Sequence, residues 1–245
     1  MEAMGLLQRL FGRQKSMGPR CTAVVPAAGR SLRMGEDKLF LSLGEVPMIL
    51  RTLRTLESSG YIAEIVIATQ EESIVPLGQL CKDAALTKVT KIVVGGETRA
   101  ASVLAGIREA DPTTELIAVH DGDRPLATVG LIDAAIEKAA ERGAAAPAVP
   151  VKDTVKRAVG GMVETTLDRS ELFAVQTPQV FEHGLILGAL EKAIADGAAI
   201  TDDCSAVERL GVPVCLTEGS YDNIKLTTPE DLAVAEAILE RWGLL

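Results

Sequence analysis

Short apolar runs and longer amphipathic stretches alternate along this 245-residue chain. The runs of strand length are Thr22–Val25, Glu64–Ala68, Lys91–Val94, Leu116–Val119, Ala146–Val149 and Val214–Leu216. Between several of them, apolar residues recur every three or four positions, as on the buried face of a helix. Three such sets are Met48, Leu50, Leu53 and Leu56; Val103, Ile107 and Ala110; and Ile132, Ile136 and Ala140. Strands that alternate with helices predict an α/β protein with a parallel sheet and helices on both faces.

The pattern changes after Pro150. Two polar, β-prone runs flank a pair of glycines, which is a turn signal for a hairpin: Asp153–Val159, Gly160-Gly161 and Met162–Leu167. A hairpin this polar has little to bury by itself, so it predicts an arm at about residues 150–172 that packs on a partner, with dimerisation as its use. Further helices are predicted near Glu182–Ala195, Asp203–Leu210 and Pro229–Arg241.

Composition narrows the class of protein. The chain is interpreted as an N-terminal extension over residues 1–20 and one domain over residues 21–245, with no apolar run long enough to cross a membrane. A net charge of −9 argues against broad nucleic-acid binding, but local cations still permit a small anionic substrate. The four cysteines form no Cys-x-x-Cys pair, so we expect buried, reduced thiols in a cytoplasmic protein. The two histidines lie far apart, and no zinc site is expected.

The end of the first strand carries the most informative motif. After Pro26 come three residues with little or no side chain, and then basic residues: Ala27, Ala28, Gly29, Arg30, Arg33 and Lys38. Bare backbone amides beside clustered cations predict a loop that binds a polyphosphate. The alternative is a tight turn with solvated arginines. The loop is neither a Walker motif nor a dinucleotide fingerprint, because Ser31 stands where a second glycine is needed.

Two other strands end in candidate ligand-binding residues. Gly95 and Gly96 would let the backbone approach a planar base, and Ser102 offers a hydroxyl one helical turn later; a plain helix N-terminus is the alternative. Asp121 follows the next strand and is placed to hold Mg²⁺ against a phosphate, with Arg124 either orienting it or touching the substrate; a simple turn is the alternative. Ligands of parallel sheets bind outside the carboxyl ends of the strands, where all three motifs fall.

A further acid and lysine precede the last predicted helix. Thr228, Pro229 and Asp231 are explained as the cap of that helix. Capping does not explain Asp222 and Lys225, which are therefore functional candidates.

At these spacings the chain resembles the 2-C-methyl-D-erythritol 4-phosphate cytidylyltransferases of the non-mevalonate isoprenoid pathway, from Cys21 to about Leu239. The order and spacing of the segments are specific, although each one alone is weak. They are Pro26–Gly29, Arg33-Met34, Lys38, Gly95-Gly96 with Arg99 and Ser102, His120-Asp121 with Arg124-Pro125, Val151–Lys156, Asp168-Arg169, Gln176–Gln179, Ile200–Asp202 and Asp222–Lys225.

The resemblance implies a Rossmann-like nucleotidyltransferase fold, a homodimer joined by exchanged arms, and transfer of CMP from CTP to methylerythritol phosphate with Mg²⁺ as cofactor. It implies a nucleotide site formed by Ala27, Ala28, Gly29, Gly95, Gly96, Ser102, Asp121 and Arg124. Arg33 and Lys38 would hold the triphosphate, Lys225 would lie at the α-phosphate, and Asp121 with Asp222 would hold the metal. Around the acceptor, Thr154 and Arg169 from the neighbour's arm would join Thr177 and Thr201.

The match also has departures. Ser31 replaces a glycine of the family's phosphate loop, and Gly122-Asp123 stands where two alanines are usual. Asp123 is either a solvated rim residue or a carboxylate that weakens triphosphate binding. Two alternatives therefore stay open: a cytidylyltransferase for ribitol 5-phosphate or another polyol phosphate, and a non-catalytic nucleotide-binding relative. A dehydrogenase is excluded, because the glycine fingerprint is missing.

Overall fold

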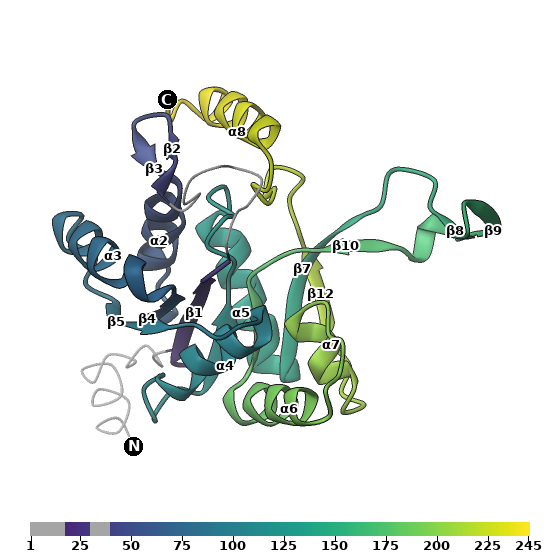
Figure 1. The fold of residues 1–245 in the computed structure, drawn as a ribbon, viewed down its shortest axis with the longest axis horizontal. Helices are drawn as coiled ribbons and strands as arrows, with labels where there is room; N and C mark the ends of the chain where they lie inside the picture. The colour runs from purple at the N-terminus through teal and green to yellow at the C-terminus, as the bar shows by residue number, and fades with distance from the viewer. Residues whose placement is uncertain (1–17, 30–39) are drawn as a thin grey trace, which may run out of the picture.

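The computed structural model describes residues 18–29 and 40–245, which form a central sheet between two layers of helices (Figure 1). The strands of the sheet follow the order β10-β7-β11-β6-β1-β4-β5. The strand β12 lies off this path and also pairs with β7. Their bounds are β1 Cys21–Ala27, β4 Ile62–Thr69, β5 Val89–Val94, β6 Leu116–Val119, β7 Ala144–Pro150, β10 Phe173–Val175, β11 Gln179–Glu182 and β12 Cys215–Glu218. All six predicted strands are present, and the fourth has the predicted bounds.

The prediction of a parallel sheet is correct for most of the sheet and wrong for two strands. β1 runs parallel to β4 and β6, β4 runs parallel to β5, and β12 runs parallel to β7. However, β10 and β11 run antiparallel to β7, and β11 also runs antiparallel to β6. These short strands return from the arm without a crossover helix, so the alternation of strands and helices did not predict them.

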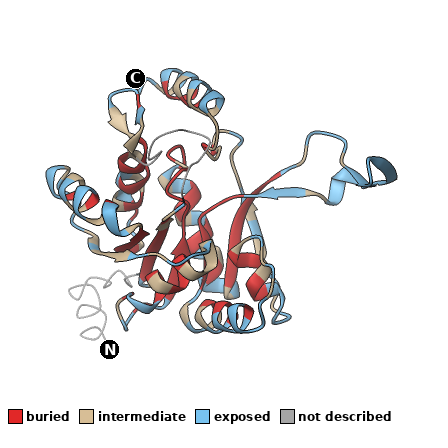
Figure 2. Cartoon of the chain, in the orientation of Figure 1, coloured by how far each residue is buried: buried red, intermediate tan, exposed pale blue. Residues whose placement is uncertain are grey.

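Helices cover both faces of the sheet, as predicted. One buried cluster joins the sheet to α2 (Met48–Ser58), α3 (Glu71–Asp83) and α5 (Val129–Arg142). A second joins it to α4 (Arg99–Arg108), α6 (His183–Ala195) and α7 (Asp203–Glu208). A smaller cluster packs α8 (Pro229–Trp242) against the residues around β2 (Ser42–Leu43) and β3 (Val46–Pro47). Figure 2 shows the buried residues concentrated in the central strands and on the helix faces turned toward them.

Three details of the helix prediction were wrong. Ala110 lies beyond the end of α4, and Ala140 is exposed on α5, where Ala139 is the buried residue. The helix α3 was not predicted at all. It contains Pro76, which cannot donate to the helical hydrogen-bond ladder, and it buries only a narrow stripe of Ser73, Leu77 and Cys81.

The predicted arm is confirmed as a protruding hairpin, on the right in Figure 1. Its strands are β8 (Lys156–Val159) and β9 (Met162–Thr166), and every residue of both is exposed. Gly160 and Gly161 have φ values of 58° and 80°, which a two-residue hairpin turn requires. A short 3-10 helix, η2 (Arg169–Glu171), leads back to β10. The arm leaves large apolar side chains exposed, among them Val159, Met162 and Val163.

The predictions from composition have mixed outcomes. All four cysteines are free; Cys21, Cys81 and Cys204 are buried, whereas Cys215 is half-buried. No helix within the described ranges combines the length and the apolar character that a membrane span needs. Most of the proposed N-terminal extension, residues 1–17, lies outside the described residues.

Candidate active site

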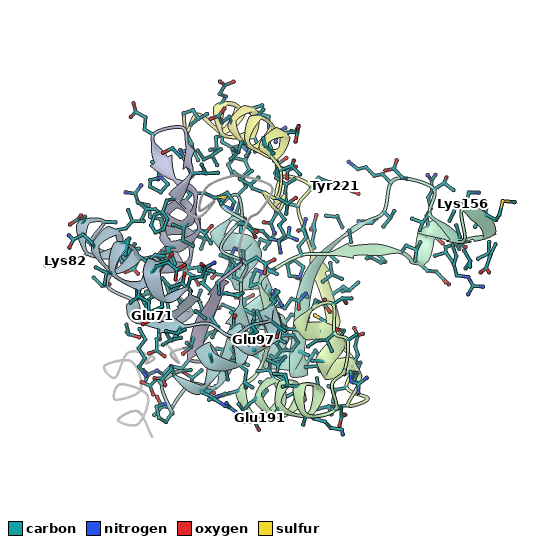
Figure 3. All side chains as sticks on the ribbon, in the orientation of Figure 1. Glu71, Lys82, Glu97, Lys156, Glu191 and Tyr221 are labelled. Carbon is teal, nitrogen blue, oxygen red and sulfur yellow. The ribbon has the colours of Figure 1, made fainter. Side chains whose placement is uncertain are left out.

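A cleft of about 820 Å³ opens at the carboxyl ends of the central parallel strands. Its walls include eight of the predicted site residues: Ala27, Ala28, Gly29, Gly95, Gly96, Ser102, Asp121 and Lys225. The expectation that the motifs after three different strands meet at one edge of the sheet is therefore confirmed. Acidic side chains also line the cleft, among them Glu71 and Glu97, which Figure 3 labels.

The first wall of the cleft is the segment after β1. The first strand was predicted to end at Val25, before Pro26. Instead, Pro26 pairs in register with Ala68, and β1 continues to Ala27. Two side chains at the end of β4 fix this segment: Thr69 Oγ1, from the last residue of the strand, donates to the Ala27 carbonyl at 3.2 Å, and Gln70 Nε2 donates to the Ala28 carbonyl at 3.0 Å. The small residues are thus held by their backbone, which leaves their bare surface toward the cleft.

The two glycines of the second wall are required by packing within the protein. A Cβ atom on Gly95 would lie 2.7 Å from Ala28 Cβ and 2.8 Å from Ser102 Oγ, and one on Gly96 would collide with Ala101. Ser102 Oγ accepts from the Gly96 N–H at 3.1 Å, so its hydroxyl shapes the loop as well as facing the cleft. The alternative interpretation of this segment, a plain helix N-terminus, is also correct in part, since α4 begins here with Thr98 as its N-cap.

Asp121 is the electrostatic centre of the site. Its Oδ1 accepts from Arg99 Nη2 at 3.0 Å, and its Oδ2 accepts from Lys225 Nζ at 2.8 Å. Arg124 Nε lies 3.8 Å from the same Oδ2. Burial alone would raise the pKa of Asp121, but the charges of Arg99 and Lys225 outweigh it and hold that pKa well below its usual range. The carboxylate is therefore ionised at neutral pH and surrounded by three cations.

Behind Asp121, two buried side chains support its backbone. Thr177 Oγ1 accepts from the Asp121 N–H at 3.1 Å and lies 3.1 Å from His120 Nδ1, while His120 Nε2 lies 3.4 Å from the Arg124 carbonyl. The pattern assigns a neutral imidazole with its proton on Nε2, since that nitrogen faces a carbonyl oxygen. Burial lowers the pKa of His120 to about 4, in agreement with this assignment. Thr177 thus lies behind Asp121, outside the cleft lining.

Replacing His120 with Gln is expected to flatten the acid dependence of stability. The pKa of His120 falls from 6.5 in the unfolded chain to about 4 in the folded one. Its contribution is therefore complete above pH 6.5 and is lost as the pH falls toward 4, up to about 3 kcal/mol. Denaturant unfolding at pH 7 and pH 4.5 measures this, with His183→Gln as the control. An unchanged pH dependence in His120→Gln would contradict the assignment.

Arg124 joins the two loops that carry the charged groups. Its side chain is only 13% exposed, and its Nη1 donates to the Asn223 carbonyl at 2.7 Å. Asn223 Nδ2 donates in turn to the Thr177 carbonyl, and the Leu226 N–H donates to the Asp123 carbonyl. Of the two roles considered for Arg124, this geometry favours orienting Asp121 and the Lys225 loop; direct nucleotide contact stays a prediction.

The other predicted metal ligand, Asp222, lies apart from the cleft lining. Its carboxylate pairs with Arg241 near the end of α8. Asp123 lines the cleft and is buried, 3.9 Å from Lys225 Nζ, so the solvated-rim interpretation of Asp123 was wrong. Within residues 18–29 and 40–245, no three His, Cys, Asp or Glu residues converge as a metal cluster. Asp121 nonetheless fits Mg²⁺, which proteins often hold by one or two carboxylates together with substrate phosphates.

The remaining predicted residues are dispersed. Thr201 lines a second cavity of about 420 Å³, which shares Thr98 and Arg99 with the first. Thr154 and Arg169 belong to the exposed arm and line neither of these cavities in their own chain. Arg33 and Lys38 lie outside the described residues.

Sequence reasoning missed a buried partner of the site. Arg99 Nη1 donates to Asp203 Oδ2 at 2.8 Å, and the Asp203 side chain is fully buried. Gln179 Oε1 accepts from the Asp203 and Cys204 N–H groups, which docks the start of α7 on β11. Asp202 and Gln179 stand in segments that the sequence had singled out, whereas Asp203 only began a predicted helix, and nothing in the sequence indicated that Asp203 pairs with Arg99.

The three-layer fold, the cleft at the strand ends and the cations around Asp121 define a nucleotide-binding α/β enzyme. The model of the 2-C-methyl-D-erythritol 4-phosphate cytidylyltransferase family matches residues 21–241, and the chain belongs to this family. It is accordingly a CTP-dependent nucleotidyltransferase, as the resemblance implied.

Relatives of known name agree over nearly the whole chain. The chain is 45% identical over 220 residues to a 2-C-methyl-D-erythritol 4-phosphate cytidylyltransferase of Halalkalibacterium halodurans, covering 89% of this chain and 96% of that one. It is 47% identical over 219 residues to the protein of that name from Geobacillus kaustophilus, covering 89% and 96%. Among solved structures, 4-diphosphocytidyl-2C-methyl-D-erythritol synthase from Anaerococcus prevotii superposes with a TM-score of 0.83 at 32% identity, covering 91% of this chain and 97% of that chain.

Proposed function

We infer that this enzyme transfers CMP from CTP to 2-C-methyl-D-erythritol 4-phosphate, giving 4-diphosphocytidyl-2-C-methyl-D-erythritol and pyrophosphate. The observation that carries the inference is one cleft that is lined by the Lys225–Asp121 pair and by the bare Ala27–Gly29 segment, in a chain that belongs to this family. A cleft of this size suits a nucleoside triphosphate.

The chemistry follows from the charges. A phosphate oxygen of the acceptor forms a bond to the α-phosphorus of CTP, the bond from that phosphorus to the β-phosphate oxygen breaks, and pyrophosphate leaves. Because two polyanions must meet, the protein acts by positioning and by stabilising negative charge, and no protein nucleophile is needed. Lys225 lies on the cleft wall with its side chain 37% exposed, and we assign it to the charge that develops on the transferring phosphoryl group. Arg33 and Lys38 are proposed for the triphosphate.

We propose Mg²⁺ as the cofactor, with Asp121 as the residue that best fits it. When bound, the ion would neutralise charge on the triphosphate and on the leaving pyrophosphate. The chain's own part is to present an ionised carboxylate oxygen at the cleft. Asp222 would have to leave Arg241 to take part, so its role as a second ligand rests on the family resemblance alone.

We further propose a homodimer in which each arm reaches the other subunit. The exposed apolar side chains of β8 and β9 support a partner surface, and the exposed positions of Thr154 and Arg169 on the arm fit a site in trans. Thr201 would complete the acceptor site from the body of the protein, whereas a direct acceptor contact by Thr177, which lines neither cavity, rests on the family resemblance alone. A cytoplasmic location is proposed from the four unpaired cysteines.

Replacing Arg169 with Ala is expected to raise the KM for the acceptor only at the opposite subunit's site. Arg169 donates to the Lys152 carbonyl within the arm, and it lines neither cavity of its own chain. Mixed dimers that combine Arg169→Ala with a Lys225→Ala subunit measure this: one active site would lack both side chains and the other would keep both. Wild-type-like KM at the intact site supports exchange, whereas a dimer with no intact site refutes it.

The product tests the proposed function directly. Phosphorus NMR of the enzyme with CTP, Mg²⁺ and 2-C-methyl-D-erythritol 4-phosphate is expected to show inorganic pyrophosphate and a new diphosphate diester in equal amounts. Hydrolysis of CTP to CMP without the diester would contradict transfer to this acceptor.

A further inference from the structure

The guanidinium of Arg99 bridges two carboxylates that lie in different layers of the fold. Its Nε and Nη2 donate to Asp121 Oδ1 at 3.2 and 3.0 Å, and its Nη1 donates to Asp203 Oδ2 at 2.8 Å. A planar guanidinium can serve both partners at once, which a compact ammonium does less well. Arg99 also stands on the wall shared by the two cavities.

Asp203 is a fixed anchor. Its side chain is completely buried, and its backbone N–H is held by Gln179 Oε1 at 2.9 Å. Gln179 also donates to Asp202 Oδ2, the carboxylate that caps α7. Since α7 and β11 hold Asp203 in place, Asp203 in turn limits where the Arg99 guanidinium can go.

Lys225 differs from Arg99 in freedom. The two side chains are similarly exposed, 37% for Lys225 and 31% for Arg99, so the difference lies in their partners. Lys225 holds the other oxygen of Asp121, and its second carboxylate neighbour, Asp123, is 3.9 Å away, whereas Arg99 donates to two carboxylates at hydrogen-bond distance. Lys225 can therefore move from Asp121 to a substrate phosphate, while Arg99 stays on Asp121 and keeps that carboxylate oriented.

We propose that Arg99 is a positioning residue for Asp121, and that Asp203 is the anchor that keeps Arg99 on Asp121 and away from the substrate's phosphates. This inference rests on the proposed function, because it assigns the roles of Asp121 and Lys225 in that reaction. Residues that orient the ligands of a reacting centre change activity or metal affinity by about 10- to 100-fold when they are replaced.

The test compares Arg99→Lys, Asp203→Asn, the double variant and the control Arg108→Lys, which alters an exposed ion pair with Glu191 at the other end of α4. Arg99→Lys and Asp203→Asn are each expected to lower kcat about 10- to 100-fold with less than about 3-fold change in KM for CTP. The double variant is expected to be no worse than the poorer single one, because Asp203 acts through Arg99. Arg108→Lys is expected to behave as the wild type.

A second readout needs no acceptor. Calorimetric titration of CTP at several Mg²⁺ concentrations is expected to show that Arg99→Lys needs at least about 3-fold more Mg²⁺ than the wild type for half-maximal CTP affinity. If the wild type does not use methylerythritol phosphate as an acceptor but Arg99→Lys still needs more Mg²⁺ for CTP binding, the acceptor assignment fails and the positioning role stands. A lowered melting temperature with unchanged kcat would mean that the Arg99–Asp203 pair is merely structural, which would overturn the proposal. A double variant whose loss of kcat equals the full sum of the two single losses would overturn it as well. Should Arg99→Lys not fold, Asp203→Asn alone decides in the same two readouts.

Discussion

Replacing Lys225 with Ala is expected to lower kcat by at least ~10²-fold, the scale for losing one preorganised electrostatic contact to a developing charge. Lys225 is the described lysine on the cleft wall, and its ammonium group lies 2.8 Å from Asp121 Oδ2. The fold is expected to survive, because Asp121 keeps Arg99 as a partner and the Lys225 side chain is partly exposed. Steady-state kinetics with saturating CTP and acceptor measure the loss.

Two further variants serve as controls for the kcat of Lys225→Ala. Lys192→Ala removes an exposed lysine of α6 that pairs with Asp196 and lines neither cavity, and it is expected to leave kcat unchanged. Lys225→Arg keeps the charge with a different shape and is expected to recover part of the activity. Near-normal kcat in Lys225→Ala, in a sample with wild-type circular dichroism, would remove Lys225 from the chemistry.

Replacing Asp121 with Asn is expected to move two measurements in opposite directions. With Mg²⁺ present, kcat falls by about 10²- to 10³-fold, because the ionised oxygen that fits the metal is lost. Without metal, CTP binds more tightly than to the wild type, because Arg99, Arg124 and Lys225 no longer share their charge with a carboxylate. Calorimetry in excess chelator measures the second effect.

The matched control is Asp111→Asn, which neutralises a more exposed carboxylate paired with Arg20. It is expected to change neither turnover nor metal-free affinity. Metal-free CTP binding that is unchanged or weaker in Asp121→Asn would contradict the view that this carboxylate is the counter-ion of a phosphate-binding group. Because Asp121 is a buried ion-pair partner, its replacement is expected to lower stability. The assays are therefore run at a temperature at which thermal unfolding shows Asp121→Asn to be folded.

The part of the site that the sequence predicted is the part that topology determines. Ala27 ends β1, and Gly95 and Asp121 follow β5 and β6, which belong to the parallel part of the sheet, so their meeting at one edge needed only the strand assignment. The strand Leu116–Val119 is wholly buried, and its continuous apolar run was an unambiguous signal. The glycine pair at 160–161 likewise specified the turn of the arm by local backbone conformation alone.

The features that the sequence did not predict depend on tertiary packing. Arg99 and Asp203 are 104 positions apart, and their pairing follows from the docking of α7 on β11 through Gln179. The short strand β11 has only four residues and runs antiparallel to its neighbour β6. No local sequence pattern indicates that direction. The helix α3 forms despite Pro76, because its buried stripe packs Leu77 and Cys81 into the core.

The most direct test of the central claim is pyrophosphate release from CTP and Mg²⁺ with 2-C-methyl-D-erythritol 4-phosphate and ribitol 5-phosphate offered separately. The account predicts release with methylerythritol phosphate and at most a trace with ribitol phosphate. Release with ribitol phosphate alone would keep the chemistry of the cleft and contradict the acceptor. No release with either, from folded protein that binds CTP, would contradict catalysis itself and direct attention to Asp123, the buried carboxylate beside Lys225.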